Sequence, residues 1–321
     1  MNDAKKIGIL FGQENSFPQA FIDRVNQIGQ GAFQAEAVLI DKVFQGMPTT
    51  YHVIVDRISH DVPFYRAFLK NAALQGTAVI NNPFWWSADE KFFNNCLAEK
   101  IDIALPKTAI LPSFDLPEDT TGASFRNLAY PLDWESIFSY VGFPAYMKPF
   151  AGGGWKSVYR VENADDFYRI HQKTSRLVML LQEEIVFDQY YRCYAVGGKY
   201  VRIMRYDPRN PPHLRYQAGF EPHPDLLARM ENDVLKINQY LGYDFNTVEF
   251  AVRDGVPYAI DFCNPAPDAD INSVGEENFE WVVEHMARFT IEKASEFKEG
   301  IDNLTWGKYL RQVIKKEPLI L

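Results

Sequence analysis

The chain has 321 residues, of which 47% are hydrophobic and 15% are aromatic, so it can bury a large core and is not expected to be disordered. Its net charge of −9 argues against general binding to nucleic acid or to a membrane surface. No stretch approaches the roughly 20 apolar residues that span a bilayer, and the length predicts about two domains.

The three cysteines, Cys96, Cys193 and Cys263, are far apart and follow no metal-ligand spacing. We expect them to be reduced thiols of a cytoplasmic protein, because disulfides are rare in that compartment. The N-terminal apolar run Ile7–Phe11 is too short for the core of a signal peptide.

The first part of the chain alternates short apolar runs with helical spacing. Strands are predicted at 7–11, 35–40, 52–55 and 77–80, and helices at 18–28 and 63–74, each with a proline at its start. This alternation predicts a parallel sheet covered on both faces. The unit ends near residue 104 and lacks a G-x-G-x-x-G turn, so we expect one wall of a cleft and no dinucleotide site.

A second group of elements begins with a helix at Ser87. Ser87 and Glu90 have the spacing of a capping box, and Lys91 follows about one turn into the helix. Taken by itself, Lys91 is typical of an exposed helix lysine. The following segments are predicted as an extended crossover at 103–111, a linker or mobile loop at 115–122, and a short helix at 134–140.

A glycine-rich loop joins two strand signals, Ala145–Pro149 and Ser157–Val161, which predicts a hairpin. Gly152, Gly153 and Gly154 have no side chains that would keep backbone N–H groups away from an anion, so the loop can cradle phosphate. A flexible hairpin tip without a ligand is the alternative, because such loops are common.

Lysines and aromatics surround these glycines. Lys148 at the strand end and Lys156 in the loop would add positive charge beside a bound phosphate. Large aromatic side chains mostly pack, so Trp155 is expected to pack rather than cover a nucleotide. Tyr190 and Tyr191 are expected to be ordinary strand aromatics.

The rest of the chain again mixes strands and helices. Predicted elements are a helix at 164–175, a strand at 177–182, a hairpin of 190–196 and 199–204, a loop at 207–213, a helix at 224–241, a hairpin of 246–252 and 257–262, a long helix at 278–297 and a short helix beyond residue 301.

Two carboxylates lie on otherwise apolar strands of the last hairpin, Glu249 in TVEFAV and Asp261 in PYAIDF. Buried carboxylates are usually paired or bound to metal. We expect a three-residue loop, Asp254-Gly255-Val256, because it places Glu249 across from Asp261 on one face, whereas a two-residue turn would separate them. With Asn264 they would offer hard oxygen ligands suited to Mg²⁺. Carboxylates paired with arginine are the alternative.

These features follow one another in a fixed order: Lys91, Lys148, the glycines, a strand running into Gln182-Glu183-Glu184, a hairpin with arginines, and the acidic hairpin. Over roughly residues 87–290 this order resembles the ATP-grasp superfamily, which includes glutathione synthetase, D-alanine–D-alanine ligase and biotin carboxylase. The resemblance implies an N-terminal α/β domain followed by a two-lobed fold with antiparallel sheets. The implied boundaries are 1–104 for the α/β domain, 105–180 for the small lobe, 181–300 for the large lobe and 301–321 for a tail helix.

The resemblance also implies a role for each matching residue. Lys91 and Lys148 would touch the α- and β-phosphates of ATP, and Gly152, Gly153 and Gly154 would close over the phosphates. The backbone of Gln182, Glu183, Glu184 and Ile185 would read the adenine edge, with Val186 completing it, and Asp188 would contact the ribose. Arg192 and Arg205 would neutralise the phosphoryl group and the acyl-phosphate, while Glu249, Asp261 and Asn264 would bind Mg²⁺ or Mn²⁺.

One departure concerns the run Asp-Phe-Cys-Asn. In the family the second carboxylate often lies two residues before the asparagine. Here the residue two before Asn264 is Phe262. One of Asp261 and Asn264 therefore does not match the metal-ligand pattern of the family. Asp268 or Asp270 could serve as the metal ligand in its place.

The function implied by the resemblance is ATP-dependent ligation of a carboxylate to an amine through an acyl-phosphate. The expected partners are small-molecule or peptide carboxylates and amines, with no nucleic acid and no membrane, and a homodimer is common among such proteins. Two alternatives stay open: a kinase of the same fold that phosphorylates a hydroxyl, and a non-catalytic nucleotide-binding module.

Overall fold

The computed structural model describes residues 4–84, 90–217 and 222–298. The chain forms two compact units, each considered by itself: Met1–Ser87 with Gln189–Phe250 and Asp261–Leu321, and Ala88–Asp188 with Ala251–Ile260. The domain boundaries expected from the sequence stay a prediction, and the expected tail helix at 301–321 lies outside the described residues.

The first unit begins with the parallel sheet that the alternating pattern predicts. Its strands are β1 (Lys5–Leu10), β2 (Phe33–Ala37), β3 (Val53–Asp56) and β4 (Ala78–Ile80), in the order β2-β1-β3-β4. Two helices that begin at or next to a proline, α1 (Phe17–Gly29) and α2 (Pro63–Leu74), connect them.

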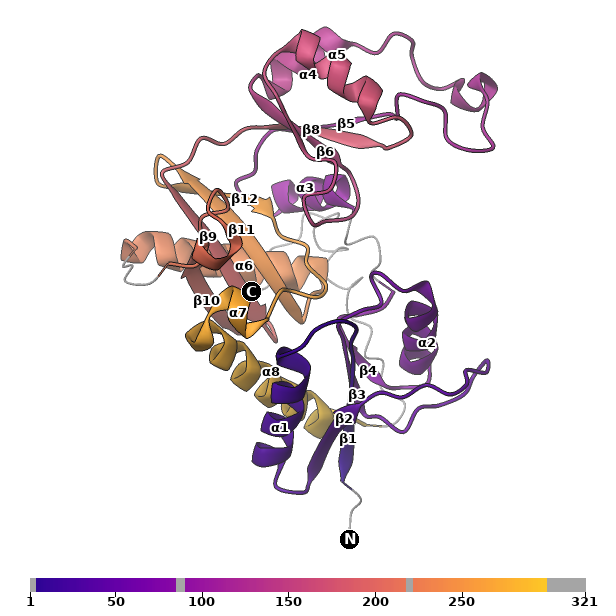
Figure 1. Cartoon of the computed structure of the whole chain (residues 1–321), viewed down its shortest axis with the longest axis vertical. Coiled ribbons are helices and arrows are strands. Elements are labelled where there is room, and N and C mark those ends of the chain that lie inside the picture. The colour runs from indigo at the N-terminus through magenta and orange to yellow at the C-terminus, as the bar shows by residue number, and fades with distance from the viewer. Residues whose placement is uncertain (1–3, 85–89, 218–221, 299–321) are drawn as a thin grey trace. The chain divides into compact units, whose positions relative to one another are not determined.

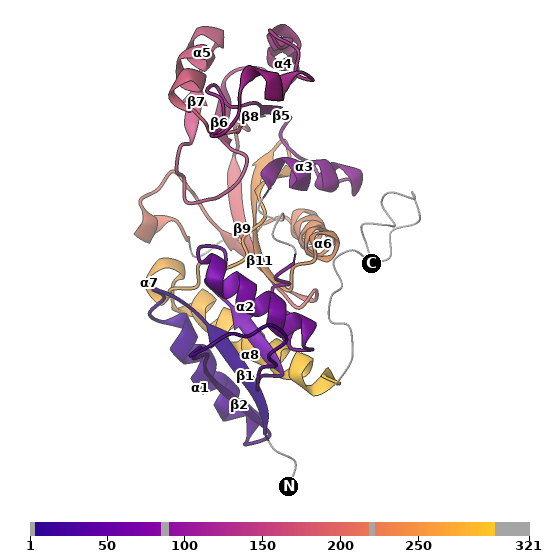
Figure 2. The same cartoon turned by 90° about the vertical axis from the view of Figure 1, so that its right-hand side faces the viewer.

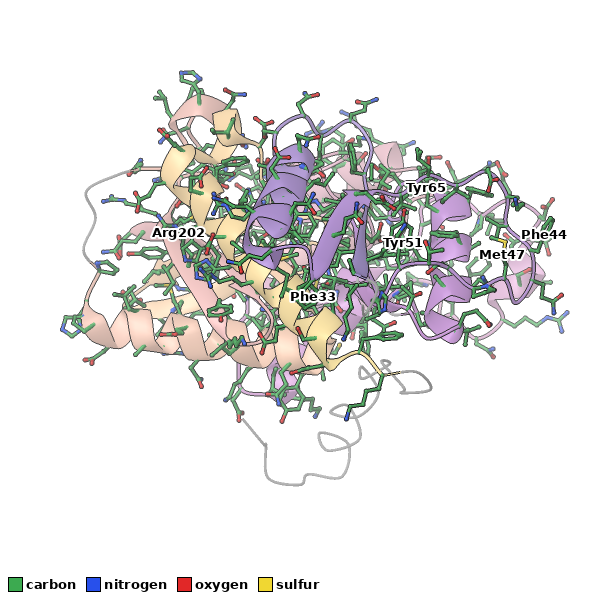
Figure 3. All side chains as sticks on the ribbon, turned by 90° about the horizontal axis from the view of Figure 1, so that it is seen from below. Phe33, Phe44, Met47, Tyr51, Tyr65 and Arg202 are labelled. Carbon is green, nitrogen blue, oxygen red and sulfur yellow. The ribbon has the colours of Figure 1, made fainter. Side chains whose placement is uncertain are left out.

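Helices cover both faces of this sheet, and α1 and α8 (Glu276–Glu296) lie side by side on one of them (Figures 1 and 2). Ile9 and Val55 share a core with α1 and α8, whereas Ile54 points the other way, toward α2. Tyr51 and Tyr65 are partly buried on the α2 side, as Figure 3 shows. The alternation of strand residues therefore builds two separate cores.

A second sheet belongs to the latter part of the chain. Its strands are β9 (Gln189–Val196), β10 (Tyr200–Arg205), β11 (Phe245–Arg253) and β12 (Val256–Asp261), in the order β10-β9-β11-β12, with β9 and β10 antiparallel. The helix α6 (Pro224–Leu241) packs against β9 and β10 and ends at Gly242, which is left-handed.

The second unit contains the antiparallel sheet around the glycine loop. Its strands are β5 (Thr108–Leu111), β6 (Ala145–Pro149), β7 (Tyr159–Val161) and β8 (Met179–Glu183), in the order β5-β8-β6-β7. Its helices are α3 (Lys91–Lys100), α4 (Trp134–Val141) and α5 (Ala164–Lys173), and Figure 1 shows α4 and α5 beside this sheet. The predicted fold class, an N-terminal parallel α/β sheet followed by two antiparallel sheets, is confirmed.

Some local expectations differ from the structure. The helix expected from Ser87 begins at Lys91 with Glu90 as its N-cap, and Ser87 lies outside the described residues. The short helix α7 (Ile271–Val274) was not predicted from periodicity; the Asp270 side chain caps it by accepting from the backbone N–H of Asn272. Within the described ranges, no helix is long and apolar enough to cross a membrane.

Candidate functional site

The glycine loop joins β6 to β7, and its residues 151–156 are exposed. Gly152 and Gly154 have φ values of +84° and +73°, which glycine adopts without steric cost. A Cβ built on either of them, or on Gly153, would meet no atom within 4 Å. Trp155 also has a positive φ, and 66% of its surface is exposed, so the expectation that it packs is wrong.

The two expected phosphate lysines lie at the base of this loop. Lys148 is on β6, and its Nζ is 3.5 Å from the carbonyl oxygen of Ile260. Lys91 donates twice, from its backbone N–H to the carbonyl of Phe150 and from its Nζ to the carbonyl of Gly152, both at 2.7 Å. Because Phe150 directly follows β6, both lysines bring positive charge to the same strand end.

The segment expected to read adenine continues from β8, and its side chains are engaged within the unit. Gln182 is buried, with 3% of its surface exposed. Glu183 accepts from Arg253 Nη1 at 2.9 Å, and Glu184 pairs with Arg160 Nη2 at 2.8 Å. Any contact of this segment with a base would therefore use its backbone.

The following residues leave backbone groups for such a contact. Among the described hydrogen bonds, none uses the backbone N–H of Ile185 or Val186 as a donor. Asp188 ends the segment, and its N–H donates to the carbonyl of Val252 at 3.0 Å. Ile185 is buried, whereas 74% of the surface of Val186 is exposed.

In the other unit, Tyr190, Arg192 and Glu249 come together on β9 and β11. The Tyr190 hydroxyl donates to Glu249 Oε2 at 2.7 Å, and Arg192 Nε lies 3.6 Å from Glu249 Oε1. Burial raises the pKa of Tyr190 well above its usual value, and the charge of Glu249 adds to the shift, so the phenol stays protonated as a donor. Glu249 is thus partnered by a phenol and an arginine, the alternative that the sequence left open.

Arg192 is the buried centre of this group. Its Nη1 donates to the hydroxyl of Tyr216 at 3.0 Å, and its guanidinium lies 5.6 Å from the centre of the Tyr206 ring. Its Nε is buried and has no hydrogen-bond acceptor within the described chain. A buried N–H without an acceptor costs about 1–3 kcal/mol, so this atom marks a place where an added oxygen acceptor would stabilise the protein.

Arg205 faces the other side of the sheet from Arg192. The register pairs Arg205 with Tyr191, the neighbour of Arg192 on β9, and successive strand residues point to opposite faces. The structure therefore does not bring the two expected arginines together. Arg215 lies closer to the group, because its Nη1 donates to the Tyr206 hydroxyl at 3.4 Å.

The loop between β11 and β12 has two residues, so the expected three-residue loop is wrong. The strands end at Arg253 and resume at Val256, and Asp254-Gly255 has φ values of +53° and +74°, as in a type I′ turn. The N–H of Ala259 bonds outward, to the carbonyl of Ala104 at 2.9 Å, as the two-residue register requires. The Asp-Gly pair favours this tight turn because both residues tolerate a positive φ.

The shorter turn changes which side chains share a face. In an uninterrupted ladder it sets Glu249 opposite Ile260 and turns Asp261 to the other face. Asp261 is the last residue of β12, and its charge still contributes to the raised pKa of Tyr190, after burial and Glu249. Both carboxylates therefore act on the same phenol, although the ladder does not place them across from each other.

The proposed metal ligands form a partial set in the protein alone. Within residues 4–84, 90–217 and 222–298, no three His, Cys, Asp or Glu side chains gather as a metal-binding group. Asn264 donates through Nδ2 to the carbonyl of Thr247 at 3.4 Å, and this bond does not use its side-chain oxygen. Mg²⁺ is commonly held by one or two carboxylates together with substrate phosphates. Any metal site that uses Glu249 and Asn264 would therefore need further ligands from outside the described residues.

A cavity of about 630 Å³ opens beyond the carboxyl ends of β1 and β3. It is lined by the loops that follow these strands and by the segment after β12: Gly12, Gln13, Glu14, Asn15, Arg57, Ile58, His60, Asp61, Ala266 and Asp270. Arg57 bonds Glu14 through Nε at 2.9 Å and the carbonyl of Pro267 through Nη2 at 2.6 Å. Because Asp61 and Asp270 also line it, the cavity has an excess of negative charge. No motif in the sequence predicted this cavity, although the N-terminal unit was expected to form one wall of a cleft.

Three solved structures of ligases have a fold similar to that of this chain. The D-alanine–D-alanine ligase of Bacillus anthracis, complexed with ATP, aligns with a TM-score of 0.63 and 16% identity over 91% of this chain and 98% of that chain. The VanG D-Ala:D-Ser ligase of Enterococcus faecalis gives 0.65 and 12% over 91% and 99%. The ATP-grasp ligase PsnB, complexed with a minimal precursor, Mg and ADP, gives 0.61 and 13% over 90% and 97%. The chain has the ATP-grasp fold.

Sequence comparisons identify fewer similar proteins than the comparison of folds. No protein-family model matches the chain. The mitochondrial acetyl-CoA carboxylase of Saccharomyces cerevisiae is 26% identical over 125 residues, which cover 34% of this chain and 5% of that protein. The chain therefore spans a small part of the length of this curated relative, and the identities support the ATP-grasp fold rather than a particular chemistry.

Two residues of the group around Glu249 and Arg192 were not predicted as functional. Tyr190 is the hydrogen-bond partner of Glu249 rather than an ordinary strand aromatic. Arg215, which follows the strand β10 in a loop, donates to the hydroxyl of Tyr206. Their positions depend on strand pairing and on the loop after β10, and the one local signal is the density of tyrosine and arginine in these segments.

Proposed function

We propose that this chain is an ATP-dependent carboxylate–amine ligase. A substrate carboxylate attacks the γ-phosphate of ATP to give an acyl-phosphate and ADP, and an amine then displaces phosphate to form an amide. The ATP-grasp fold and the ligase activity named for the three similar solved structures support this proposal.

The observation that carries the proposal is the group of Tyr190, Arg192 and Glu249. A carboxylate that attacks a triphosphate brings negative charge toward negative charge, so catalysis must come mainly from alignment and charge neutralisation. Arg192, with Arg215 in place of Arg205, would neutralise the transferring phosphoryl group. Tyr190 would orient Glu249 through its 2.7 Å hydrogen bond.

The remaining site residues keep the roles that the ATP-grasp resemblance implies. Glu249 and Asn264 would hold Mg²⁺, or Mn²⁺, which would neutralise charge on the phosphates; Asp261 is left out of this set, because the two-residue turn directs it to the other face. Lys91, Lys148 and the glycine loop would bind the phosphates. The backbone of Gln182, Glu183, Glu184 and Ile185 would bind adenine, and Asp188 would bind the ribose.

The cavity beyond β1 and β3 is the proposed place of the amine substrate. Ligands of open α/β sheets bind outside the carboxyl ends of the strands. The carboxylates of Glu14, Asp61 and Asp270 outnumber the guanidinium of Arg57 in its lining, which favours a ligand with a positively charged amino group. A location in the cytoplasm is part of the proposal, because no disulfide involves the three cysteines.

The test is ADP release in the presence of Mg²⁺ across a panel of carboxylic acids and amines. We expect release that requires both substrates, and a loss of about 100-fold in Glu249→Gln, because its charge serves both the metal and Arg192. Glu292→Gln, which changes a surface carboxylate on α8 paired with Lys199, is the matched control and should leave the rate unchanged.

Other products would identify the alternatives. A phosphorylated alcohol would indicate a kinase of the same fold. Nucleotide binding that does not depend on Mg²⁺, without ADP release from any acid, would indicate a non-catalytic module. The feature that favours the module is Phe262, 3% exposed, at the position where the family pattern has a carboxylate.

A further inference from the structure

The glycine loop, residues 150–157, is largely exposed although it is expected to bind a ligand. Residues 151–156 are exposed, and two of the glycines, with Trp155 and Ser157, have positive φ values. In the part of the chain that the structure describes, the bond from Lys91 Nζ to the carbonyl of Gly152 is the single hydrogen bond that links residues 151–157 to the rest of the unit.

The geometry around Lys91 makes this bond a defined tether. Lys91 is the first residue of α3, and its backbone N–H is held by the carbonyl of Phe150 at 2.7 Å. The side chain then reaches two residues further along the loop, to Gly152, at the same distance of 2.7 Å. Lys91 therefore holds both the residue that follows β6, Phe150, and the first glycine of the loop, Gly152.

We propose that Lys91 is a positioning residue that sets the conformation of the glycine loop before nucleotide binds. One consequence of this inference rests on the proposed function: a phosphate of ATP would compete with the Gly152 carbonyl for the ammonium group of Lys91. A phosphate oxygen carries negative charge and forms the stronger, charge-assisted hydrogen bond. Arrival of phosphate at Lys91 would therefore release the tether and free Trp155, at the exposed tip, to move.

The decisive test uses the protein without nucleotide. Chymotrypsin cleaves after aromatic residues, so the rate of nicking after Trp155 measures how often the loop opens. We expect Lys91→Met to raise this rate roughly 5- to 10-fold, because one exposed charged hydrogen bond is lost, while the cooperative unfolding transition stays in place. Lys91→Arg keeps a charged donor and should stay near the wild-type rate.

Lys156→Met is the matched control, because it removes a lysine of the loop itself without removing the tether. It should leave nicking after Trp155 unchanged. Equal nicking rates for the wild-type protein and Lys91→Met would overturn the proposal, as would an equal acceleration by Lys156→Met.

Titration calorimetry measures ATP binding to the same proteins, and this measurement separates the inference from the proposed function. Faster nicking in Lys91→Met together with no ATP binding by the wild type supports the tether and removes the ligase proposal. Weaker ATP binding in Lys91→Met with unchanged nicking identifies Lys91 as a phosphate ligand only and overturns the tether.

Discussion

Arg57 shows how a single buried charge connects distant parts of the first unit. Its side chain is 1% exposed, it pairs with Glu14, and it lies 5.0 Å and 5.5 Å from the ring centres of Phe17 and Phe245. Its bond to the carbonyl of Pro267 adds the segment after β12. The guanidinium thus joins the loop after β1, the end of β3 and a late segment of the chain around the cavity.

We predict that Glu14→Gln lowers the free energy of unfolding by about 3–5 kcal/mol, because it leaves the Arg57 guanidinium buried without a counter-charge. Urea unfolding at neutral pH measures the effect. Glu280→Gln, which breaks an ion pair between Arg24 and a half-exposed carboxylate, is the control and should cost about 1 kcal/mol or less. A cost for Glu14→Gln no larger than that of the control would contradict the prediction.

The turn between β9 and β10 shows how one element depends on another. Gly197 and Gly198 have φ values of +63° and +67°. A Cβ on Gly197 would come within 2.5 Å of Phe289 Cδ2 on α8, whereas one on Gly198 would meet nothing within 4 Å. The two positions therefore share backbone strain, and only the first also has a packing constraint.

This difference predicts the outcome of two matched substitutions. Gly198→Ala should cost about 1 kcal/mol from the left-handed backbone alone. Gly197→Ala should cost a further 1–3 kcal/mol or so, because α8 must shift to admit the methyl group. Thermal unfolding of both variants measures the gap, and equal melting temperatures would show that Phe289 moves aside freely.

Local elements were the part that the sequence predicted well. Helices such as α2 and α6 follow from apolar spacing with a proline at the start, and the parallel N-terminal sheet follows from the alternation of elements, although its strand order was not predicted. The Asp254-Gly255 turn was also visible, but a longer loop was preferred in order to bring two carboxylates together. The pairing of Tyr190 with Glu249 and the tether from Lys91 could not be predicted, because they join residues brought together only by folding.

At the scale of the whole molecule, buried tyrosines predict sensitivity to alkali. Burial raises the pKa of Tyr51, Tyr191 and Tyr216 to about 12, and those of Tyr190 and Tyr194 rise as well. A folded-state pKa above the unfolded value stabilises the fold fully below the unfolded pKa of about 10, and this contribution is lost as the pH rises toward the folded value.

We therefore expect the free energy of unfolding to fall between about pH 10 and pH 12, by up to 1.4 kcal/mol or so per pH unit for each such tyrosine. Urea unfolding across this range tests it. Tyr51→Phe should reduce the slope, because phenylalanine cannot ionise. A flat profile in the wild-type protein would contradict the prediction.

The packing of α8 against the N-terminal sheet has a consequence for biosynthesis. Ile9 and Val55 are made early, yet the core that covers them is completed by Val282 and Met286, which leave the ribosome much later. Until then the growing polypeptide exposes a hydrophobic surface of the kind that chaperones bind. A messenger truncated ahead of α8 should accordingly yield a product that depends on chaperones for survival, however well its own strands and helices form.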